Sequence, residues 1–118
     1  MYIFRKASYE EISVLKDSCK MYGIDCTDEN ILFFFGKMRT VFGKPHYVSD
    51  DCKYMQYWIT AEDGQNKIYF SVVHDSSGVS VGIQNTICFI IYNDSGDTSF
   101  IDEFITLVEN TESESADF

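Results

Sequence analysis

The chain has 118 residues, of which 45% are hydrophobic and 16% aromatic, and this composition suffices for one domain with a packed core. Its net charge of −10 argues against proteins that bind nucleic acid or anionic membranes through a basic surface. No run approaches the roughly 20 apolar residues of a bilayer span, and the first residues lack the long apolar stretch of a signal peptide, so we expect a cytoplasmic protein.

The charge is divided unevenly along the chain. Residues 50 to 118 carry thirteen acidic and two basic residues, and no basic residue follows Lys67. An acidic surface attracts cations or a basic protein over about 8 Å in physiological salt. The alternative interpretation is that the acidic surplus serves only solubility. We expect the four cysteines to be reduced, because a core this rich in Phe and Ile needs no disulfides: Cys19, Cys26, Cys52 and Cys88.

The first predicted helix lies near the start of the chain. Before it, the short apolar segment 1–4 is either an edge strand or an anchor laid on the core. Ser8 followed by Glu11 forms a capping box, which predicts that a helix begins there. Apolar residues then recur at helical spacing on one face, namely Ile12, Leu15, Cys19 and Tyr22. Gly23 is placed to end this amphipathic helix.

A second helix is predicted to begin at Thr27, where Asp28 and Glu29 favour the positive end of the helix dipole. Its body carries an apolar stripe, which predicts a lid on the buried face of a sheet: Ile31, Phe35, Met38 and Phe42. A membrane-surface helix is the weaker interpretation, because such helices carry a strongly basic polar face. Gly43 and Pro45 end the helix.

The middle of the chain predicts a sheet. Polar and apolar positions partly alternate in 54–62 and 67–74, as on strands with one buried face. The loop 63–66 joins these strands as a hairpin. The run 86–92 does not alternate, and it therefore predicts a central strand that is covered on both faces.

Other segments complete the prediction. Residues 46–49 predict a short strand, and 79–85 predict either a strand bent at Gly82, which we favour, or a separate short strand. The turn-forming cluster 93–97 precedes a final helix that Thr98 or Ser99 caps and that runs to about Glu109.

Together these segments predict a single α+β domain over residues 1–110, followed by an acidic disordered tail over 111–118. The domain consists of two N-terminal helices, a central antiparallel β-sheet of about three to five strands between residues 46 and 92, and a C-terminal helix. We expect the helices to lie mainly on one side of the sheet.

Catalytic chemistry has little support in the sequence. No motif for nucleotide binding or metalloprotease chemistry is present. A thiol enzyme needs a cysteine beside a histidine base, and the nearest pair, His46 and Cys52, has no nucleophile turn around it. The cysteine and histidine spacings do not fit zinc, and the loop 93–97 is not followed by the Glu of an EF-hand. We therefore expect no catalysis, no cofactor and no metal.

One group of residues remains as a candidate surface for a binding partner. It combines aromatic residues of the predicted hairpin strands with acidic residues of the flanking loops: Tyr54, Tyr57, Trp58 and Tyr69, with Asp50, Asp51, Glu62, Asp63 and Asp75. Aromatic centres supply affinity at protein interfaces, and charged rims supply fast encounter. Alternation places Tyr57 on one face and Tyr54 with Trp58 on the other, so at least one set is a candidate for exposure unless all the rings pack under helices.

In its general character the chain resembles the small acidic immunity proteins that bacteria keep beside secreted or contact-delivered toxins. The resemblance rests on the missing catalytic motifs, the single domain, the run without Lys or Arg from Ile68 to Phe118, and the aromatic hairpin from Tyr54 to Tyr69. It implies a monomer that, in a 1:1 complex, neutralises a basic protein partner, foremost a toxin nuclease domain, by covering its active site or a nearby surface. Neither nucleic acid nor a membrane is then a direct partner.

Two other functions stay open. An acidic mimic of nucleic acid, an anti-defence inhibitor of phage or plasmid origin, would space its carboxylates like phosphates along one ridge. A small-ligand-binding domain or enzyme would need a deep pocket with convergent polar groups near His46, Cys52 or His74.

Overall fold

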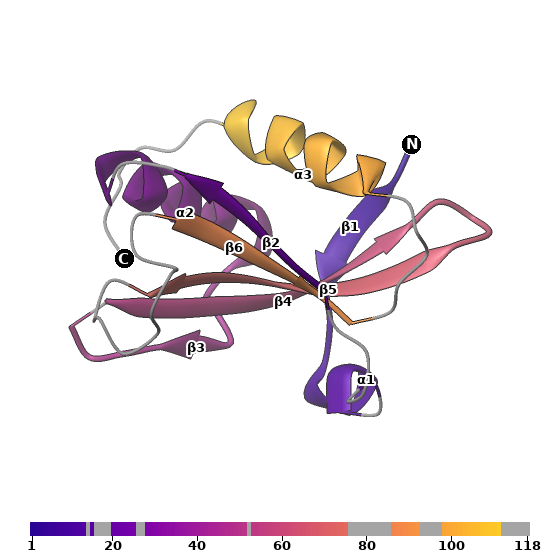
Figure 1. Ribbon diagram of the computed structural model, residues 1–118, viewed down its shortest axis with the longest axis horizontal. Helices are drawn as coiled ribbons and strands as arrows, with labels where there is room; N and C mark the ends of the chain where they lie inside the picture. The colour runs from indigo at the N-terminus through magenta and orange to yellow at the C-terminus, as the bar shows by residue number, and fades with distance from the viewer. Residues whose placement is uncertain are drawn as a thin grey trace.

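The computed structural model describes residues 1–13, 15, 20–25, 28–51, 53–75, 86–92 and 98–111. These residues form an α+β fold with an antiparallel six-stranded sheet and three helices (Figure 1). The strands are β1 (Ile3–Lys6), β2 (Lys20–Asp25), β3 (Tyr47–Val48), β4 (Tyr54–Glu62), β5 (Lys67–Asp75) and β6 (Thr86–Ile91). The helices are α1 (Tyr9–Ser13), α2 (Asp28–Phe42) and α3 (Ser99–Glu109).

The hairpin of β4 and β5 is the centre of the sheet. Its residue pairs run from Glu62 opposite Lys67 to Tyr54 opposite Asp75. β6 continues the sheet beyond β5 and β2 follows it, which gives the order β1-β4-β5-β6-β2. The other edge of β4 is shared by two short strands placed end to end, because β1 pairs with 59–62 and β3 with 55–56.

Helices α2 and α3 cover one face of the sheet, whereas α1 lies on the opposite side (Figure 1). Alternate residues of β4 point to the covered face and are fully buried there, namely Met55, Tyr57, Ile59 and Ala61. The other residues of β4 point to the face turned away from α2 and α3, which we call the outer face. Its side chains on β4 are those of Tyr54, Gln56, Trp58, Thr60 and Glu62.

The core between the helices and the sheet is largely aromatic. Phe104 of α3 is at its centre, with its ring centroid 5.2 Å from those of Phe4 and Phe70 and 6.0 Å from that of Phe89. Three residues of the predicted stripe on α2 are fully buried in this core: Ile31, Phe35 and Met38. The stripe therefore has the role of a lid that its spacing predicts.

The first helix is much shorter than the sequence predicts. The capping box is present, since the Glu11 amide donates to Ser8 Oγ over 3.2 Å and the Ser8 amide donates to Glu11 Oε1 over 3.2 Å. The helix nevertheless ends at Ser13, and residues predicted to continue it form β2. All six residues of β2 pair with β6, and these long-range backbone hydrogen bonds outweigh the local helical spacing.

The sheet also has more strands than the range 46–92 was expected to hold. β1 confirms the edge-strand alternative for segment 1–4, displaced to Ile3–Lys6, whereas β2 was not predicted as a strand. The other described elements occur where the sequence predicts them, and β6 is a central strand with buried residues on both faces. The predictions for 79–85, for 93–97 and for the tail beyond Thr111 fall outside the described residues.

Candidate functional site

The four aromatic residues proposed for partner binding lie on two different faces of the sheet. Tyr57 is buried beneath the helices with 0% exposure, and its hydroxyl donates to the Gly43 carbonyl over 2.7 Å. Burial raises the pKa of Tyr57. Tyr54, Trp58 and Tyr69 lie on the outer face and are partly exposed. The structure thus corrects the expectation for Tyr57, which offers no surface to a partner, and leaves the other three accessible.

Two of the candidate acidic residues hold the turns that contain them. Asp51 Oδ1 accepts hydrogen bonds from Ser49 Oγ over 2.7 Å and from the Lys53 amide over 3.0 Å. Asp63 Oδ1 accepts one from the Asn66 amide over 2.7 Å in the β4–β5 turn. These bonds lower the pKa of both carboxyl groups. Both residues therefore have a structural use besides any attraction of a partner.

The other candidate acids differ in exposure. Asp75 is only 1% exposed, which corrects its assignment to an accessible rim. Glu62 lies at the surface 3.4 Å from Lys67 Nζ, so its charge is partly compensated. Asp50 is exposed in the turn before β4. Because the candidate acids flank both ends of a nine-residue strand of about 30 Å, they do not form one compact patch.

A small cluster of opposite charges surrounds the end of the outer face near the β4–β5 turn. Arg5 of β1 lies 2.9 Å from Glu11 of α1, and Lys67 of β5 lies 3.7 Å from the same carboxylate. The hydrogen bond from Arg5 is the main reason that the pKa of Glu11 is lowered to about 2. With Glu62, the cluster holds two positive and two negative groups, so it presents no net acidic surface.

A chain of hydrogen bonds crosses the outer face from β4 to the end of β6. The Tyr54 hydroxyl donates to Gln56 Oε1 over 3.2 Å, and Gln56 Nε2 donates to Ser71 Oγ over 3.2 Å. Ser71 Oγ lies 2.6 Å from the Tyr92 hydroxyl. Trp58 is the cross-strand neighbour of Ser71. The network holds these side chains in fixed positions, so the outer face is an ordered polar and aromatic surface.

His46 bridges a gap in the sheet edge between β1 and β3. Just beyond β1, the Ala7 amide donates directly to the Trp58 carbonyl over 2.9 Å. The reciprocal bond of an antiparallel pair is relayed by the imidazole, because the Trp58 amide donates to Nδ1 over 3.1 Å and Nε2 donates to the Ala7 carbonyl over 2.8 Å. Only the neutral ring with its proton on Nε2 can accept and donate in this way.

This relay commits His46 to a structural role. Burial is the main cause that lowers the pKa of His46, and the nearby positive charge of Lys6 acts in the same direction. The ring also packs on Trp58 with 4.6 Å between centroids. Both nitrogens are thus occupied by the backbone, which leaves His46 no lone pair for a general base.

The remaining residues considered for thiol or metal chemistry lie apart. Cys52 is outside the described residues, and Cys88 is buried in β6, where burial raises the pKa of its thiol and favours the unreactive protonated form. His74 is buried on β5, with its ring 6.1 Å from that of Phe35. Across the described ranges, no three His, Cys, Asp or Glu side chains gather as a group that holds a metal ion.

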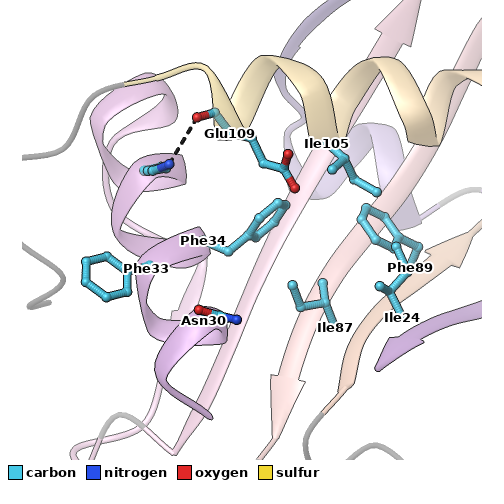
Figure 2. A pocket seen from close by; sticks show the side chains of 9 residues that line it. Ile24, Asn30, Phe33, Phe34, Ile87, Phe89, Ile105 and Glu109 are labelled. Atoms are coloured by element: carbon cyan, nitrogen blue, oxygen red, sulfur yellow. Dashed lines mark hydrogen bonds between the residues drawn. The ribbon is translucent and has the colours of Figure 1, made fainter. Parts of the chain in front are cut away.

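A crevice of about 340 Å³ opens between α2 and α3, on the helix side of the sheet (Figure 2). Apolar side chains form most of its lining: Ile24, Phe33, Phe34, Ile87, Phe89 and Ile105. Its rim is polar, because Lys37 Nζ donates to the Glu109 carbonyl over 3.0 Å and so connects the two helices, while Asn30 lies further along α2. The volume is near the lower limit of small-ligand sites. Of the residues named for the enzyme hypothesis, neither His46 nor His74 lines this crevice, and Cys52 is outside the described residues.

Comparison with protein-family models, curated proteins and solved structures finds no match to this chain. None of the helices in the described part of the chain has the length and apolarity that crossing a membrane requires.

Part of the outer face was not among the predicted partner-binding residues. Alternation places Gln56 on the same side of β4 as Tyr54 and Trp58, and the structure confirms this position, but the prediction gave Gln56 no role in binding. Ser71 and Tyr92 carried no signal, because their meeting depends on the register between strands that are far apart in sequence.

Proposed function

We propose that this protein is a non-catalytic binding protein that neutralises a basic protein partner, foremost a toxin nuclease domain, as immunity proteins do. The partner binds to the outer face of the sheet. The observation that carries this proposal is the ordered, partly exposed surface of aromatic side chains there, formed by Tyr54, Trp58, Tyr69 and Tyr92.

The outer face has the properties of a binding surface that is formed before its partner arrives. Trp58 packs between Tyr9 at 5.9 Å and His46 at 4.6 Å, so its ring is held in place in the free protein. Aromatic side chains on a rigid sheet lose little conformational entropy when a partner covers them. They are also among the residues that most often dominate the binding energy of interfaces.

The net negative charge favours a basic partner. The attraction comes from the summed charge of the protein and not from a rim of acidic loop residues. The net charge is −10, and long-range attraction depends on the summed charge. Asp51 and Asp63 hold turns and Glu62 faces Lys67, so Asp50 is the loop acid with the fewest other contacts. Converting the four acids to amides should therefore slow association only in part.

The test is binding to a purified nuclease toxin domain encoded next to this protein's gene. Trp58→Ala and Tyr69→Ala should each speed dissociation, and a hot-spot residue should cost on the order of 2 kcal/mol of binding energy. Leu32→Ala is the control, because Leu32 is 38% exposed on α2, away from the outer face. Thermal melting of each variant excludes unfolding as the cause, since Trp58 is half-buried.

Stopped-flow association from about 50 to about 500 mM salt tests the charge separately. The rate should fall severalfold across this range if an acidic protein meets a basic one. An association rate that does not change with salt concentration would indicate that the acidic surplus serves solubility. Absence of binding to the toxin domain, or dissociation that changes no more in the outer-face variants than in Leu32→Ala, would overturn the proposal.

A further inference from the structure

The edge of the sheet at β1 is an accessible surface separate from the outer face. β1 pairs with β4 on one side, and no strand of the described ranges covers its other side. The Ala7 amide bonds to β4, and backbone groups alternate along a strand, so the N–H and C=O groups of Phe4 and Lys6 point away from β4. Such an edge is a template for one more strand.

Exposed apolar side chains gather along this edge. Met1 is fully exposed, and Val41 and Leu107 are each 39% exposed. These residues line an open groove of about 600 Å³ where β1 meets α2 and α3. Isolated exposed apolar residues are common, but several of them around one groove indicate a surface that another molecule covers.

Opposite charges lie at the two ends of β1. At its N-terminal end, Glu103 of α3 accepts a hydrogen bond from the Tyr2 amide over 2.9 Å, beside Asp102. At its C-terminal end, Lys6 Nζ donates to the Lys44 carbonyl over 2.7 Å and has no ion pair with the described residues. An edge that is acidic at one end and basic at the other is complementary to an inverted copy of itself.

We propose that this edge is a homodimer interface, in which β1 pairs antiparallel with β1 of a second copy about a two-fold axis at Phe4. Phe4 then pairs with Phe4 of the partner subunit, and Tyr2 with Lys6 of the partner subunit. In this register the Tyr2 amide exchanges its hydrogen bond to Glu103 for one to the Lys6 carbonyl of the partner subunit, and the released Glu103 carboxylate accepts from the ammonium of that same lysine. The register also covers the exposed apolar side chains of both grooves.

The charges select this register over the alternatives. A shift that sets Lys6 opposite Lys6 of the partner subunit pairs fewer residues and places like charges together, which is unfavourable across strands. A lysine at a sheet edge normally discourages pairing with another strand. Here Lys6 is compatible with pairing only in the register that places it beside Glu103 of the partner subunit.

The dimer goes beyond the proposed function and replaces the monomer that the sequence led us to expect. Strand pairing at β1 leaves the outer face of each subunit free, so two subunits can each hold one partner. The two proposals fail separately, because the dimer is measured on the protein alone and the proposed function on its complex with a toxin domain.

Sedimentation equilibrium of the purified full chain, from about 1 µM to about 1 mM, tests the interface. The wild type should show a reversible monomer–dimer equilibrium. Leu107→Glu should raise the dimer dissociation constant at least about tenfold, because it places a charge in the apolar groove that the second subunit covers. Leu32→Glu makes the same change at an exposed position of α2 and should leave the constant unchanged.

A charge exchange tests the register. Lys6→Glu and Glu103→Lys should each weaken the dimer, because each opposes like charges across the two-fold axis. The double variant should recover most of the affinity, since it restores the pair with its signs exchanged. Circular dichroism confirms that each variant is folded. A wild type that stays monomeric throughout, a dimer that responds equally to Leu32→Glu, or a double variant without recovery would each overturn the proposal.

Discussion

The two faces of the sheet are built from alternate residues of the same strands, yet different forces hold them. On the helix side of β4, Met55, Tyr57 and Ile59 are fully buried in the aromatic core. On the outer face, Tyr54 and Gln56 are partly exposed and joined by hydrogen bonds. Apolar burial is the dominant favourable term in folding, whereas a hydrogen bond adds little net free energy. The helix side therefore supplies stability, and the outer face supplies fixed positions for polar groups.

The largest effect should come from the centre of the helix side. Phe104→Ala removes a ring that contacts several other rings, and it should lower the free energy of unfolding by about 3 to 5 kcal/mol. Leu107→Ala, on the same helix but 39% exposed, should cost less than about 1 kcal/mol in dilute solution. Urea denaturation measures both. An equal loss of unfolding free energy in both variants would contradict the central role in the core that the ring contacts of Phe104 indicate.

The His46 relay closes the sheet edge between β1 and β3, and acid should break it. The folded-state pKa of His46 is lowered, so its contribution to stability is present above the unfolded value of about 6.5 and is lost as the pH falls through the folded value. Removing both hydrogen bonds in His46→Ala should cost about 1 to 2 kcal/mol at neutral pH.

Gln at this position provides the matched control, because its amide can accept and donate without titrating. His46→Gln should keep most of the neutral-pH stability and show a flatter melting temperature between about pH 7.5 and about pH 5. The two proteins differ at position 46 alone, so the difference between their profiles reports on His46. Identical pH profiles for the wild type and His46→Gln would show that His46 does not carry the acid sensitivity.

The hydrogen-bond network of the outer face should matter less for stability than the core does. Ser71→Ala removes the hydroxyl that joins Gln56 to Tyr92, and it should cost about 0.5 to 1.5 kcal/mol. Ser13→Ala removes a hydroxyl near the surface of α1 and should cost less. Thermal unfolding compares the two. A loss from Ser71→Ala as large as that from Phe104→Ala would contradict the division between the faces.

The smallest effect should come from the charge cluster beside the outer face. The pKa of Glu11 is lowered to about 2, so its contribution is present above the unfolded value of about 4.3 and is lost as the pH falls toward 2. Solvent screens this pair, so Glu11→Gln should cost under about 1 kcal/mol at neutral pH, and less at high salt. Urea titrations at low and high salt measure this difference, and a loss insensitive to salt would point to the capping bond at Ser8 instead.

Local patterns determined much of the architecture. The Ser8–Glu11 capping box, the β4–β5 hairpin and the apolar stripe of α2 are all present as predicted, because each depends on residues within one or two turns of helix or one strand pair. Alternation along β4 also defined two sets of aromatic residues correctly. Those signals needed no knowledge of the rest of the chain.

Tertiary structure decided the rest. Gly23 looked like a helix end, but it lies inside β2 opposite Cys88, where a Cβ would come 3.1 Å from Thr86 Cγ2. Which aromatic residues of β4 are exposed depends on the packing of α2 and α3 against the other face of the sheet. The role of His46 depends on Ala7 lying beside Trp58. These features depend on pairings between residues that are distant in sequence. The spacing of apolar residues within one segment does not predict which other strand that segment will pair with.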